Sequence, residues 1–575
     1  MKRSEIILDI FSQILFTTFL GLIFIYEGFG LRFGREISYF IILAMPFFLF
    51  FIDIINKKEI VVPKKITILF IFFVIFSIIS TIYSLNVERS FEYLLYYLST
   101  FLMFLYVFNH KQLQKLIIIF IFAISFIFIS YSTYINYFLP KDWSFLIPSR
   151  GYQYVYAFFK THNPLGTLLL IPLTFSFSYF IGLGKKTFLI LFLIILPFFL
   201  LSYSRSGYLA FIIGGLILLI SQVKNKRVKV FSKTGLFATT VFVACLFLFV
   251  STVNYQSSPS FIKSVNNFLS TNFRLNTKTF LSERDQYFRS ALLSIRERPL
   301  FGVGPANFIF ASSKYAQSFG SLAETADNIF LEVFSENGVL AGIIFVLVIL
   351  LLLTKADKKN KAIFITFLTT LLLYMTDSSQ RYYSHYLLFF IIAGLLYSEK
   401  SYIKAKYLIF AITLLLFLAV NSMFISRFLY DQKNYKTAFY FYPLDKQVFE
   451  GYLTTIVFKK DNQYWRLYER LFNGDPSALT LIGGINLYVK NNDEALAAFK
   501  KINQYYPYSV DYFYIFKSMY ELESILNGKE RAGVLANKYF KRLETGNRLG
   551  RFDYLYGQQA RNLCWFVYGF CPFDL

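Results

Sequence analysis

Charged residues are scarce in this sequence, and histidine and cysteine are scarcer still. Only 16% of the 575 residues are Asp, Glu, Lys or Arg, whereas 56% are hydrophobic. This composition excludes an ordinary soluble globular protein. The three histidines and three cysteines form no cluster with the spacing of metal ligands, so we expect no metal and no other cofactor.

Basic residues outnumber acidic ones, and the net charge is +24. Such an excess can indicate a nucleic-acid-binding protein. Here most of it lies in short loops between apolar runs, which is the distribution that sets the orientation of membrane proteins. We therefore expect the chain to associate with a membrane and not with nucleic acid.

Apolar runs long enough to cross a bilayer recur through much of the chain. We expect an all-α polytopic membrane protein with about 13 transmembrane helices, within a range of about 12 to 14. No signal-peptide cleavage site follows the first apolar run, so that run is expected to be a span. The expected spans lie near residues 6–26, 37–55, 66–84, 92–109, 115–138, 164–184, 186–203, 207–222, 234–253, 329–354, 361–376, 384–398 and 404–424.

The loops alternate in basic charge, which predicts the orientation of the chain. Lysine and arginine concentrate in alternate loops, such as 57–65 and 224–233, and the loops between them hold fewer. Because basic loops stay in the cytoplasm, the N-terminus is expected there. An odd number of crossings then places the C-terminal segment outside, together with a large loop at 254–328.

The chain divides near residue 425. Residues 1–425 are the expected transmembrane domain, and residues 426–575 lose the long apolar runs and gain helical periodicity. Residues 476–507 resemble one tetratricopeptide unit, but a single clear unit is a weak repeat signal. We expect an external helical-hairpin domain of tetratricopeptide-like type, which could dock a protein partner.

Cys564 and Cys571 are both expected outside, where a disulfide could form. Seven residues of continuous helix span about 10 Å, which is beyond bridging distance. A bridge would therefore require the chain to turn, for which Gly569 is a candidate.

An arginine-rich segment precedes the span at 329–354. Residues 283–298 are expected to be helical and to carry Arg284, Arg289, Arg296 and Arg298. Helical spacing places Arg284 on one face and Arg289 with Arg296 on another, so the four cannot converge. Arginine binds oxyanions bidentately and stays charged, which suits a lipid pyrophosphate. Arg205, in an expected tight turn, could join this site or could simply snorkel to the membrane surface.

The turn PLFGVGPANF (299–308) follows this helix. It lacks the lysine of a nucleotide-binding loop and follows a helix, so it does not predict nucleotide binding. Its glycines and proline are explained locally by a turn that ends the helix.

Carboxylates gather just before and within the next span. Asp327 could cap that span or could act as a general base, and Glu324 is a second candidate base. Glu332 and Glu336 lie four residues apart on one helix and are expected to face protein or water. His162 and Arg381, both expected near the outer surface, are candidate substrate-binding residues, as are Arg289, Glu324 and Asn328.

These pieces, in this order, resemble the O-antigen ligase/polymerase superfamily, also called the Wzy_C family, over roughly residues 60–400. The similarity rests on SYSRSGYLAF, RDQYFRSALLSIRERPLFGVGPANF, ADNIFLEVFSENGVLAG and THNPLGTLLLIPL. It implies metal-independent, inverting transfer of an undecaprenyl-pyrophosphate-linked glycan at the outer face of the bacterial inner membrane.

The resemblance also implies roles for single residues. Arg205 and Arg284 match the family's pyrophosphate-contacting arginines. Asp327 stands where the family usually has a histidine, before Asn328. A carboxylate is a weaker base than histidine unless burial raises its pKa. The base is therefore Asp327 or another residue, Glu324 or His162, or the chain is a divergent member of the family.

Several functions remain open at this stage. The acceptor could be a glycan or lipid, as in a polysaccharide ligase or polymerase, or a protein, as in protein O-oligosaccharyltransferases of the same superfamily. A lipid-linked glycan transporter would place charges within spans around a cavity. A non-catalytic assembly scaffold is the remaining alternative.

Overall fold

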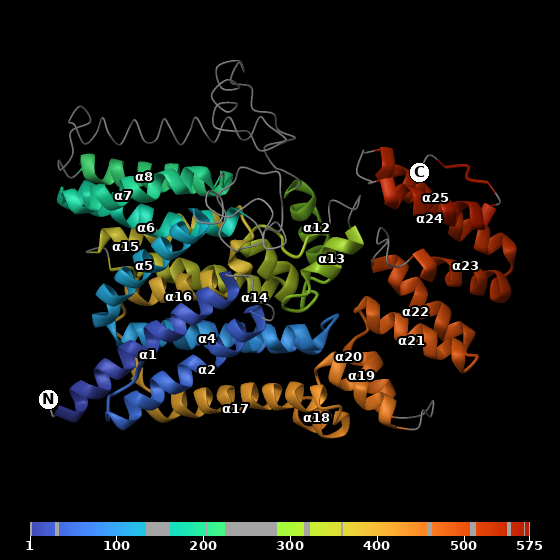
Figure 1. Ribbon diagram of the computed structural model, residues 1–575, viewed down its shortest axis with the longest axis horizontal. Helices are drawn as coiled ribbons and strands as arrows, with labels where there is room; N and C mark the ends of the chain where they lie inside the picture. Colours follow the sequence, from blue (N-terminus) through green and yellow to red (C-terminus); the bar gives the residue numbers. More distant parts are fainter. Residues whose placement is uncertain are drawn as a thin grey trace, which may run out of the picture.

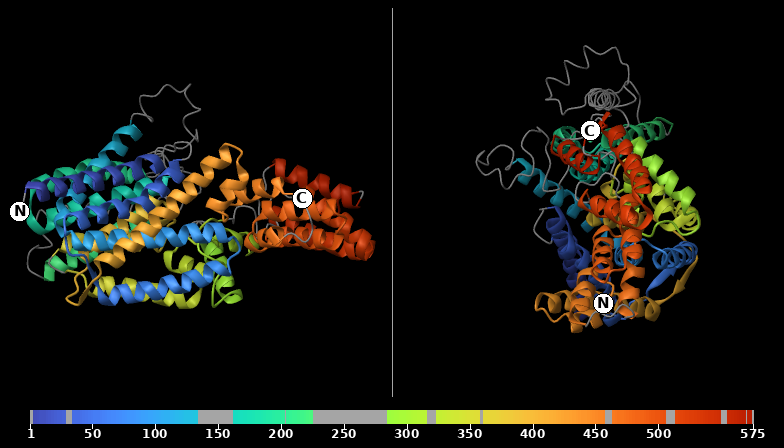
Figure 2. Two further views of the ribbon diagram at one scale, coloured as in Figure 1. Left: turned by 90° about the horizontal axis from the view of Figure 1, so that it is seen from below. Right: turned by 90° about the vertical axis from the view of Figure 1, so that its right-hand side faces the viewer.

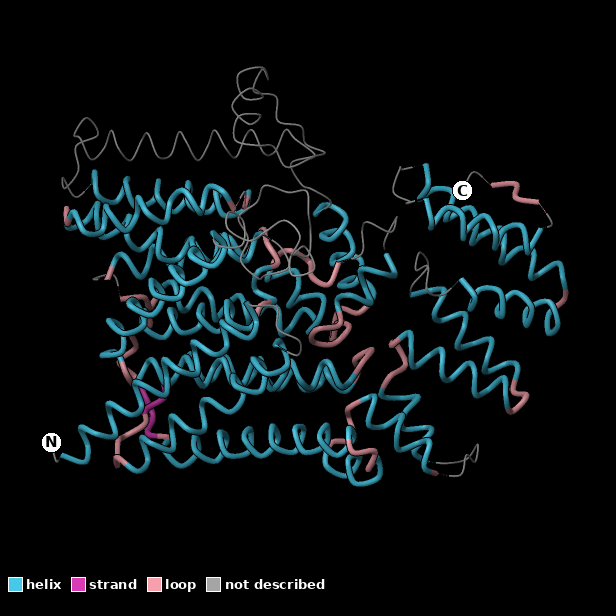
Figure 3. Tube along the Cα trace, viewed as in Figure 1, coloured by secondary structure: helices cyan, strands magenta, loops and turns pink. Residues whose placement is uncertain are grey.

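The computed structural model is almost entirely helical (Figure 3). It describes residues 3–28, 34–133, 162–202, 204–224, 284–315, 323–357, 360–456, 463–505, 513–548, 554–568 and 570–573. The bundle helices and strands are α1 (Arg3–Gly28), α2 (Gly34–Ile55), β1 (Val61–Pro63), α3 (Lys64–Ile82), α4 (Val87–Asn109), η1 (Lys111–Leu113), α5 (Gln114–Thr133), α6 (His162–Leu183), α7 (Lys186–Leu201), α8 (Arg205–Lys224), α12 (Arg284–Glu297), α13 (Phe308–Tyr315), α14 (Ile329–Thr354), α15 (Lys361–Tyr374), η5 (Ser379–Arg381), α16 (Tyr383–Leu396), β2 (Tyr402–Lys404) and α17 (Lys406–Asp431).

Within the described residues, eight helices are long and apolar enough to cross a membrane, namely α1 to α6, α14 and α17. Four shorter apolar helices, α7, α8, α15 and α16, pack among them. The prediction of an all-α membrane protein is thus confirmed. The number of about 13 spans stays a prediction, and the expected span at 234–253 lies outside the described residues.

Burial differs sharply between the helices, as expected for a bundle in lipid. The apolar windows of α4 and α6 are 78% and 83% buried, whereas those of α1 and α17 are only 22% and 28% buried. Large apolar side chains such as Leu408, Leu415 and Leu418 on α17 are exposed. Because lipid tails are as apolar as these side chains, such a surface is stable in a bilayer.

The two ends of the bundle are built differently (Figures 1 and 3). At one end, near the N-terminus, β1 pairs antiparallel with β2, with Val62 opposite Ile403. At the other end lie α12, α13 and the C-terminal helices. We call this second end the α12 end of the bundle. The two ends of the chain therefore lie at opposite ends of the helix bundle.

The C-terminal helices have a hydrophobic core of their own, and Figure 2 shows them gathered beyond the α12 end. Gly483 packs so closely against Phe499 that a Cβ would lie 2.2 Å from its ring. The helical-hairpin arrangement is present in α21 with α22 and in α23 with α24, while the tetratricopeptide type stays a prediction. The helices are α18 (Tyr435–Phe441), α19 (Lys446–Thr455), α20 (Gln463–Leu471), α21 (Pro476–Tyr488), α22 (Asn492–Tyr505), α23 (Phe513–Asn527), α24 (Lys529–Arg548) and α25 (Tyr554–Tyr568).

Cys564 and Cys571 form a disulfide, with their Cα atoms 5.2 Å apart. The bridge is reached because α25 ends at Tyr568, between the two cysteines. Gly569, the candidate for the turn, lies outside the described residues.

The C-terminal helices contact the loop between α3 and α4. The backbone N–H of Gly474 donates to the carbonyl of Leu85 at 2.9 Å, and Asn86 Nδ2 donates to Asp475 Oδ2 at 3.3 Å. Lys446 Nζ lies 3.0 Å from Asp475 Oδ1. Burial alone would raise the pKa of Asp475, but Lys446 and hydrogen bonds, including that from the Ala478 N–H, hold it below its ordinary value. This joint is close-packed, charged and hydrogen-bonded.

Candidate active site

The site is built around a break near the start of α14. Gly338 has φ 85° and ψ 170°, which is not helical. The break leaves the backbone carbonyls of Ser335 and Glu336 available to partners outside the helix. Only glycine adopts this conformation without strain, so the sequence SENG fixes the place of the break.

The glycine-rich turn after α12 binds to this break. The backbone N–H groups of Val303 and Gly304 donate to the carbonyls of Ser335 and Glu336 at 3.0 and 2.8 Å. Gly302 has φ 66°, and a Cβ there would lie 2.3 Å from the Glu336 carbonyl oxygen. The turn therefore does more than end a helix, because it fixes α12 against α14.

Three buried charged side chains, Glu332, Glu336 and Arg381, form a network that contacts the glycine-rich turn through Glu336. Glu336 Oε2 accepts from the Ala306 N–H at 2.9 Å, and its Oε1 lies 3.4 Å from Arg381 Nη2. Arg381 Nε lies 3.4 Å from Glu332 Oε1. Burial alone would lower the pKa of Arg381, but Glu332 and Glu336 raise it above its ordinary value. Arg381 is only 7% exposed, and its contact with substrate stays a prediction.

Asn328 and not Asp327 caps α14. The Asn328 side-chain oxygen accepts from the backbone N–H groups of Phe330 and Leu331, both at 3.0 Å. Of the two roles considered for Asp327, that of helix cap is therefore wrong. Asp327 instead has φ 49°, a left-handed conformation that Asp and Asn tolerate better than most residues. Its carboxylate is thereby freed from the helix end.

That carboxylate meets Arg284, the first residue of α12. Arg284 Nε lies 3.3 Å from Asp327 Oδ2, and Thr325 Oγ1 donates to Asp327 Oδ1 at 2.9 Å. The two charged side chains are only 15% and 14% exposed. The candidate catalytic residues Arg284 and Asp327, 43 positions apart in the sequence, thus form a partly buried ion pair.

Asp377 completes the group and was not predicted from the sequence. Its Oδ2 lies 3.7 Å from Arg284 Nη2, and the side chain is fully buried. Burial and the nearby Asp327 raise the pKa of Asp377 to about 6, although Arg284 and the Ser379 hydrogen bonds oppose this shift. The only sequence signal was a carboxylate in the short polar loop between two apolar runs, four residues before Arg381.

Two atoms of this group retain unused hydrogen-bonding capacity. Arg284 Nε and Asp377 Oδ2 are buried and have no hydrogen-bond partner within the described part of the chain. Buried polar atoms are nearly always satisfied, and an exception requires an explanation such as a missing ligand or water.

Arg205 begins α8 beside the same loop. Ser206 Oγ donates to the Thr376 carbonyl at 2.8 Å, and Asn328 Nδ2 donates to the Met375 carbonyl at 2.9 Å. The loop 375–377 therefore holds the start of α8 and the start of α14 together. The two sequence motifs that contain Arg205 and Asn328 therefore lie next to each other at this loop.

The other predicted residues are less central. Arg289 and Arg296, which the helical spacing placed on one face, are both exposed. The Glu324 side chain is also exposed, while its backbone carbonyl accepts from Arg381. His162 is the first residue of α6, whose start is held by His385 Nε2 lying 2.9 Å from the Pro164 carbonyl. Where side chains are described, no group of three or more His, Cys, Asp or Glu is placed to hold a metal ion.

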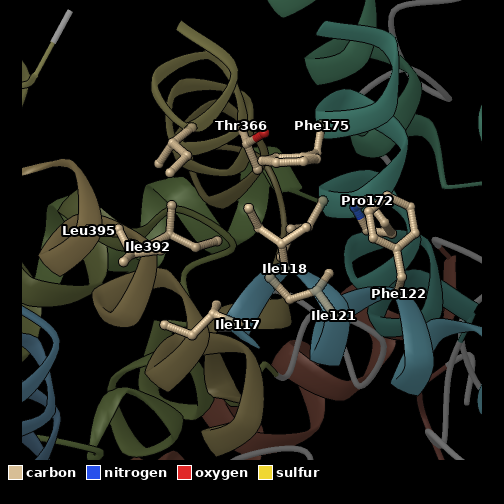
Figure 4. Close-up of a pocket in the computed structure, with 11 residues that line it drawn as sticks. Ile117, Ile118, Ile121, Phe122, Pro172, Phe175, Thr366, Ile392 and Leu395 are labelled. Atoms are coloured by element: carbon tan, nitrogen blue, oxygen red, sulfur yellow. The ribbon is translucent and has the colours of Figure 1, made fainter. Parts of the chain in front are cut away.

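A small apolar recess lies farther along the bundle, between α5, α6, α15 and α16. Figure 4 shows Ile121, Pro172 and Phe175 lining it together with Thr366 and Ile392. The Thr366 hydroxyl donates to the Ala362 carbonyl, so the recess offers no unsatisfied polar group from this residue. Its lining is therefore apolar.

Comparison with known proteins gives one result. Residues 189–346 match the family model described as O-antigen ligase (Wzy_C), a narrower range than the resemblance over 60–400. The search of curated proteins finds no match. The matched range includes Arg205, Arg284 and Asp327, and it ends before Asp377 and Arg381. Residues 189–346 are thus an O-antigen ligase family domain, which indicates a glycosyl-transferring enzyme of ligase or polymerase type in a multi-pass membrane protein.

Proposed function

We propose that this chain transfers a glycan from undecaprenyl pyrophosphate to an acceptor hydroxyl, as a polysaccharide ligase or polymerase. The observation that carries the proposal is the partly buried pair of Arg284 and Asp327 within the O-antigen ligase domain. Asp327 takes the place of the family's histidine and is not used as a helix cap. The reaction would take place at the outer face of the bacterial inner membrane.

The arginines would act on the leaving group. Arg284 has five N–H donors in a fixed fork, so its Nε can stay near Asp327 while the other nitrogens bind phosphate oxygens. Arg205 lies at the start of α8 beside the same loop. As the bond between the anomeric carbon and the pyrophosphate oxygen breaks, negative charge grows on the pyrophosphate, and fixed cations stabilise it.

Asp327 would act on the acceptor. The acceptor hydroxyl attacks the anomeric carbon from the face opposite the pyrophosphate, and its proton passes to the Asp327 carboxylate. A bond forms between the acceptor oxygen and the carbon, and the electron pair of the broken bond leaves with the polyprenyl pyrophosphate. A single displacement of this kind inverts the anomeric configuration, and it uses no metal.

The apolar recess offers a surface that the hydrocarbon chain of such a donor could contact. Ile171 in its wall is nine residues from His162 at the start of α6, or about 13 Å along the helix. A polyprenyl chain anchored at the α12 end could reach this depth in the bilayer. The walls around Ile121, Pro172 and Phe175 are apolar, which suits such a chain.

The orientation of the chain is part of the proposal. The termini lie at opposite ends of the bundle (Figure 1), which agrees with an N-terminus in the cytoplasm and C-terminal helices outside. The candidate site lies at the α12 end, on the same side as those helices. Accessibility of single introduced cysteines, at Arg3 and at Tyr488, to a membrane-impermeant thiol reagent would test this orientation.

Transfer in proteoliposomes tests the function. Wild type, Arg284→Ala and Asp327→Asn would be compared with a lipid-linked oligosaccharide as donor, and Arg296→Ala serves as a matched surface control. We expect wild type and Arg296→Ala to consume donor and the other two to lose transfer. Full transfer by both Arg284→Ala and Asp327→Asn would overturn the assignment. Loss of transfer in Arg296→Ala would show that the removal of any positive charge from α12 lowers transfer.

A protein acceptor is the second candidate. The C-terminal helices contact α13 through α22 and share the Leu85 joint with the site turn, so a protein held by them would lie near the reaction. Offering glycan, lipid and protein acceptors in parallel distinguishes these outcomes. Donor binding that Arg284→Ala abolishes, without transfer to any acceptor, would instead indicate a transporter or an assembly scaffold.

A further inference from the structure

The exposed side of α12 carries leucine and arginine in one stripe. Asp285, Arg289, Leu292 and Arg296 follow one another at helical spacing and are all exposed, and the stripe continues to Leu300 beyond the helix. Leu292 and Leu300 are 58% and 59% exposed. We propose that this stripe rests on the bilayer surface at the α12 end and contacts phospholipids. The proposal concerns a membrane contact of α12 and does not depend on glycan transfer.

The turn after α12 lies at the level where α3 ends. Tyr83 is the C-cap of α3, and its ring stacks on that of Phe301, with the ring centroids 5.0 Å apart. Ile78 and Ile82, near the end of this candidate span, are exposed, as a lipid-facing surface allows. Aromatic side chains are enriched where spans leave the hydrocarbon. The pair of Tyr83 and Phe301 therefore marks the bilayer surface next to Leu300.

α14 gives the same level for that surface. The part after its break, residues 339–354, is about 24 Å long at the helical rise, which is close to the hydrocarbon thickness of about 30 Å. Leu340 and Ile343 on this part are exposed. A Cβ on Gly338 would lie 2.1 Å from the carbonyl oxygen of Leu300. Leu300 is thus placed where the lipid-facing part of α14 begins, and the exposed apolar surface of the spans continues to the turn.

The charges on the stripe favour phospholipid as the partner. Arg289 and Arg296 lie on either side of Leu292 along the helix. A guanidinium binds two phosphate oxygens at once, and a long basic side chain reaches head groups while neighbouring apolar side chains enter the hydrocarbon boundary. A protein partner would have to cover the same arginines beside a surface that already faces lipid. Continuity with that surface therefore selects phospholipid.

The contact would fix the height of the candidate site above the hydrocarbon. Arg284 begins α12 and pairs with Asp327, so a helix that rests on the head groups holds this arginine near their level. Under the proposed function, the pyrophosphate of a lipid-linked donor lies at that level too. Loss of Arg296 alone leaves both leucines and Arg289 in place, so Arg296→Ala should keep transfer.

The depth of a spin label tests the contact. The full-length protein in nanodiscs would carry one nitroxide, at Leu292→Cys or Leu300→Cys, with Cys245→Ser to prevent labelling elsewhere. Collision rates would be measured with oxygen, which concentrates in hydrocarbon, and with a neutral nickel chelate, which stays in water. Two positions of similar exposure calibrate the result, namely Leu415 on the lipid-facing α17 at 66% and Val534 on the C-terminal α24 at 67%.

The expected result is a lipid-like ratio along the stripe. The ratio of oxygen to nickel collisions at Leu292→Cys and Leu300→Cys should be severalfold above that at Val534→Cys and should approach that at Leu415→Cys. Ratios equal to that at Val534→Cys would overturn the proposal. A raised ratio at Leu300→Cys alone would also overturn it, because the contact would then be confined to the turn. The readout does not use transfer, so failure of the proposed function would be seen separately.

Lipid composition tests the two arginines. The melting temperature would be measured in nanodiscs of phosphatidylglycerol and of phosphatidylcholine. We expect phosphatidylglycerol to raise the melting temperature of wild type more than that of the Arg289→Gln/Arg296→Gln double variant. The matched control, Arg531→Gln/Lys538→Gln, removes two exposed charges from α24 and should behave as wild type does. Equal shifts in wild type and the α12 variant, or an equal loss in the control, would overturn phosphate binding by the stripe.

Discussion

Arg284 Nε lies 3.3 Å from Asp327 Oδ2, and this pair joins the first turn of α12 to the residue before the cap of α14. Because Arg284 is fixed by a carboxylate on one side, its remaining N–H donors have a defined direction. We expect Arg284→Ala to lower kcat by about 10²- to 10³-fold, the usual cost of removing one preorganised donor. Arg284→Lys keeps the charge without the fork and should recover only part of this loss.

The measurement is initial donor consumption in proteoliposomes at saturating donor. Equal rates for Arg284→Lys and wild type would show that charge alone is needed and that the fork geometry has no role. Folding of each variant would be checked by its thermal melting temperature.

Asp327→Asn changes the charge of the candidate base and little else. Asparagine also tolerates the positive φ at this position, so the fold should be kept. We expect kcat to fall by about 10²- to 10⁴-fold, the contribution usual for general acid–base catalysis. Single-turnover transfer with saturating acceptor measures it. A fully active Asp327→Asn would leave Arg284 in place and move the base to another residue, with Glu324 the first to test.

The sequence predicted the helical elements of the site better than their contacts. Helical periodicity placed a helix at 283–298 and assigned Arg284 and Arg289 to different faces, which the structure confirms. It also identified the glycine turn and the carboxylates of α14. These are local patterns, because a period of 3.6 residues or a pair of glycines is readable without knowledge of the neighbours.

Contacts between distant segments could not be predicted in the same way. The docking of Val303 and Gly304 on the carbonyls of α14 depends on the break at Gly338, and a glycine permits such a break without showing which segment will bind there. Asp377 shares no sequence pattern with Arg284, and the two side chains approach each other only in the folded chain. Arg381 was expected to bind substrate because an arginine near a membrane surface gives no sign that Glu332 and Glu336 already surround it.

Gly302 lies against the backbone of α14. A comparison with Gly184 separates the cost of that close contact from the cost of the left-handed conformation. Gly302 and Gly184 have nearly the same φ, 66° and 67°. A Cβ on Gly302 would lie 2.3 Å from a backbone oxygen, whereas a Cβ on Gly184 would meet nothing within 4 Å. Alanine at Gly184 should cost only the left-handed conformation, about 1–2 kcal/mol. Alanine at Gly302 should cost about 1–3 kcal/mol more, the usual penalty of overpacking. Comparison of the two variants by thermal unfolding in detergent measures the difference, and equal losses would show that the turn can shift without cost.

Asp377 gives the site a defined dependence on pH. Its pKa in the folded protein is raised to about 6, above the value of about 3.9 expected when the chain is unfolded. Between these values the folded state binds more protons, so stability falls as pH rises, by up to about 1.4 kcal/mol per pH unit. Asp377→Asn removes this term and can still accept from the Ser379 N–H. The melting temperature of the variant relative to wild type should therefore rise from pH 4 to pH 6. A constant difference across this range would contradict the raised pKa.

The last prediction concerns how the C-terminal helices affect the site. Leu85 donates its N–H to the Val303 carbonyl and accepts from the Gly474 N–H, so one residue lies between the C-terminal helices and the site turn. A Cβ on Gly474 would lie 2.6 Å from Leu85 Cβ and 2.9 Å from its carbonyl oxygen. We expect Gly474→Ala to separate the two, to speed hydrogen exchange at the Leu85 amide and to lower transfer. Gly484→Ala, where nothing lies within 4 Å, is the matched control and should slightly stabilise α21, because alanine favours a helix over glycine by about 1 kcal/mol. If exchange at Leu85 rises while transfer is unchanged, the C-terminal helices are attached to the site turn without supporting its function.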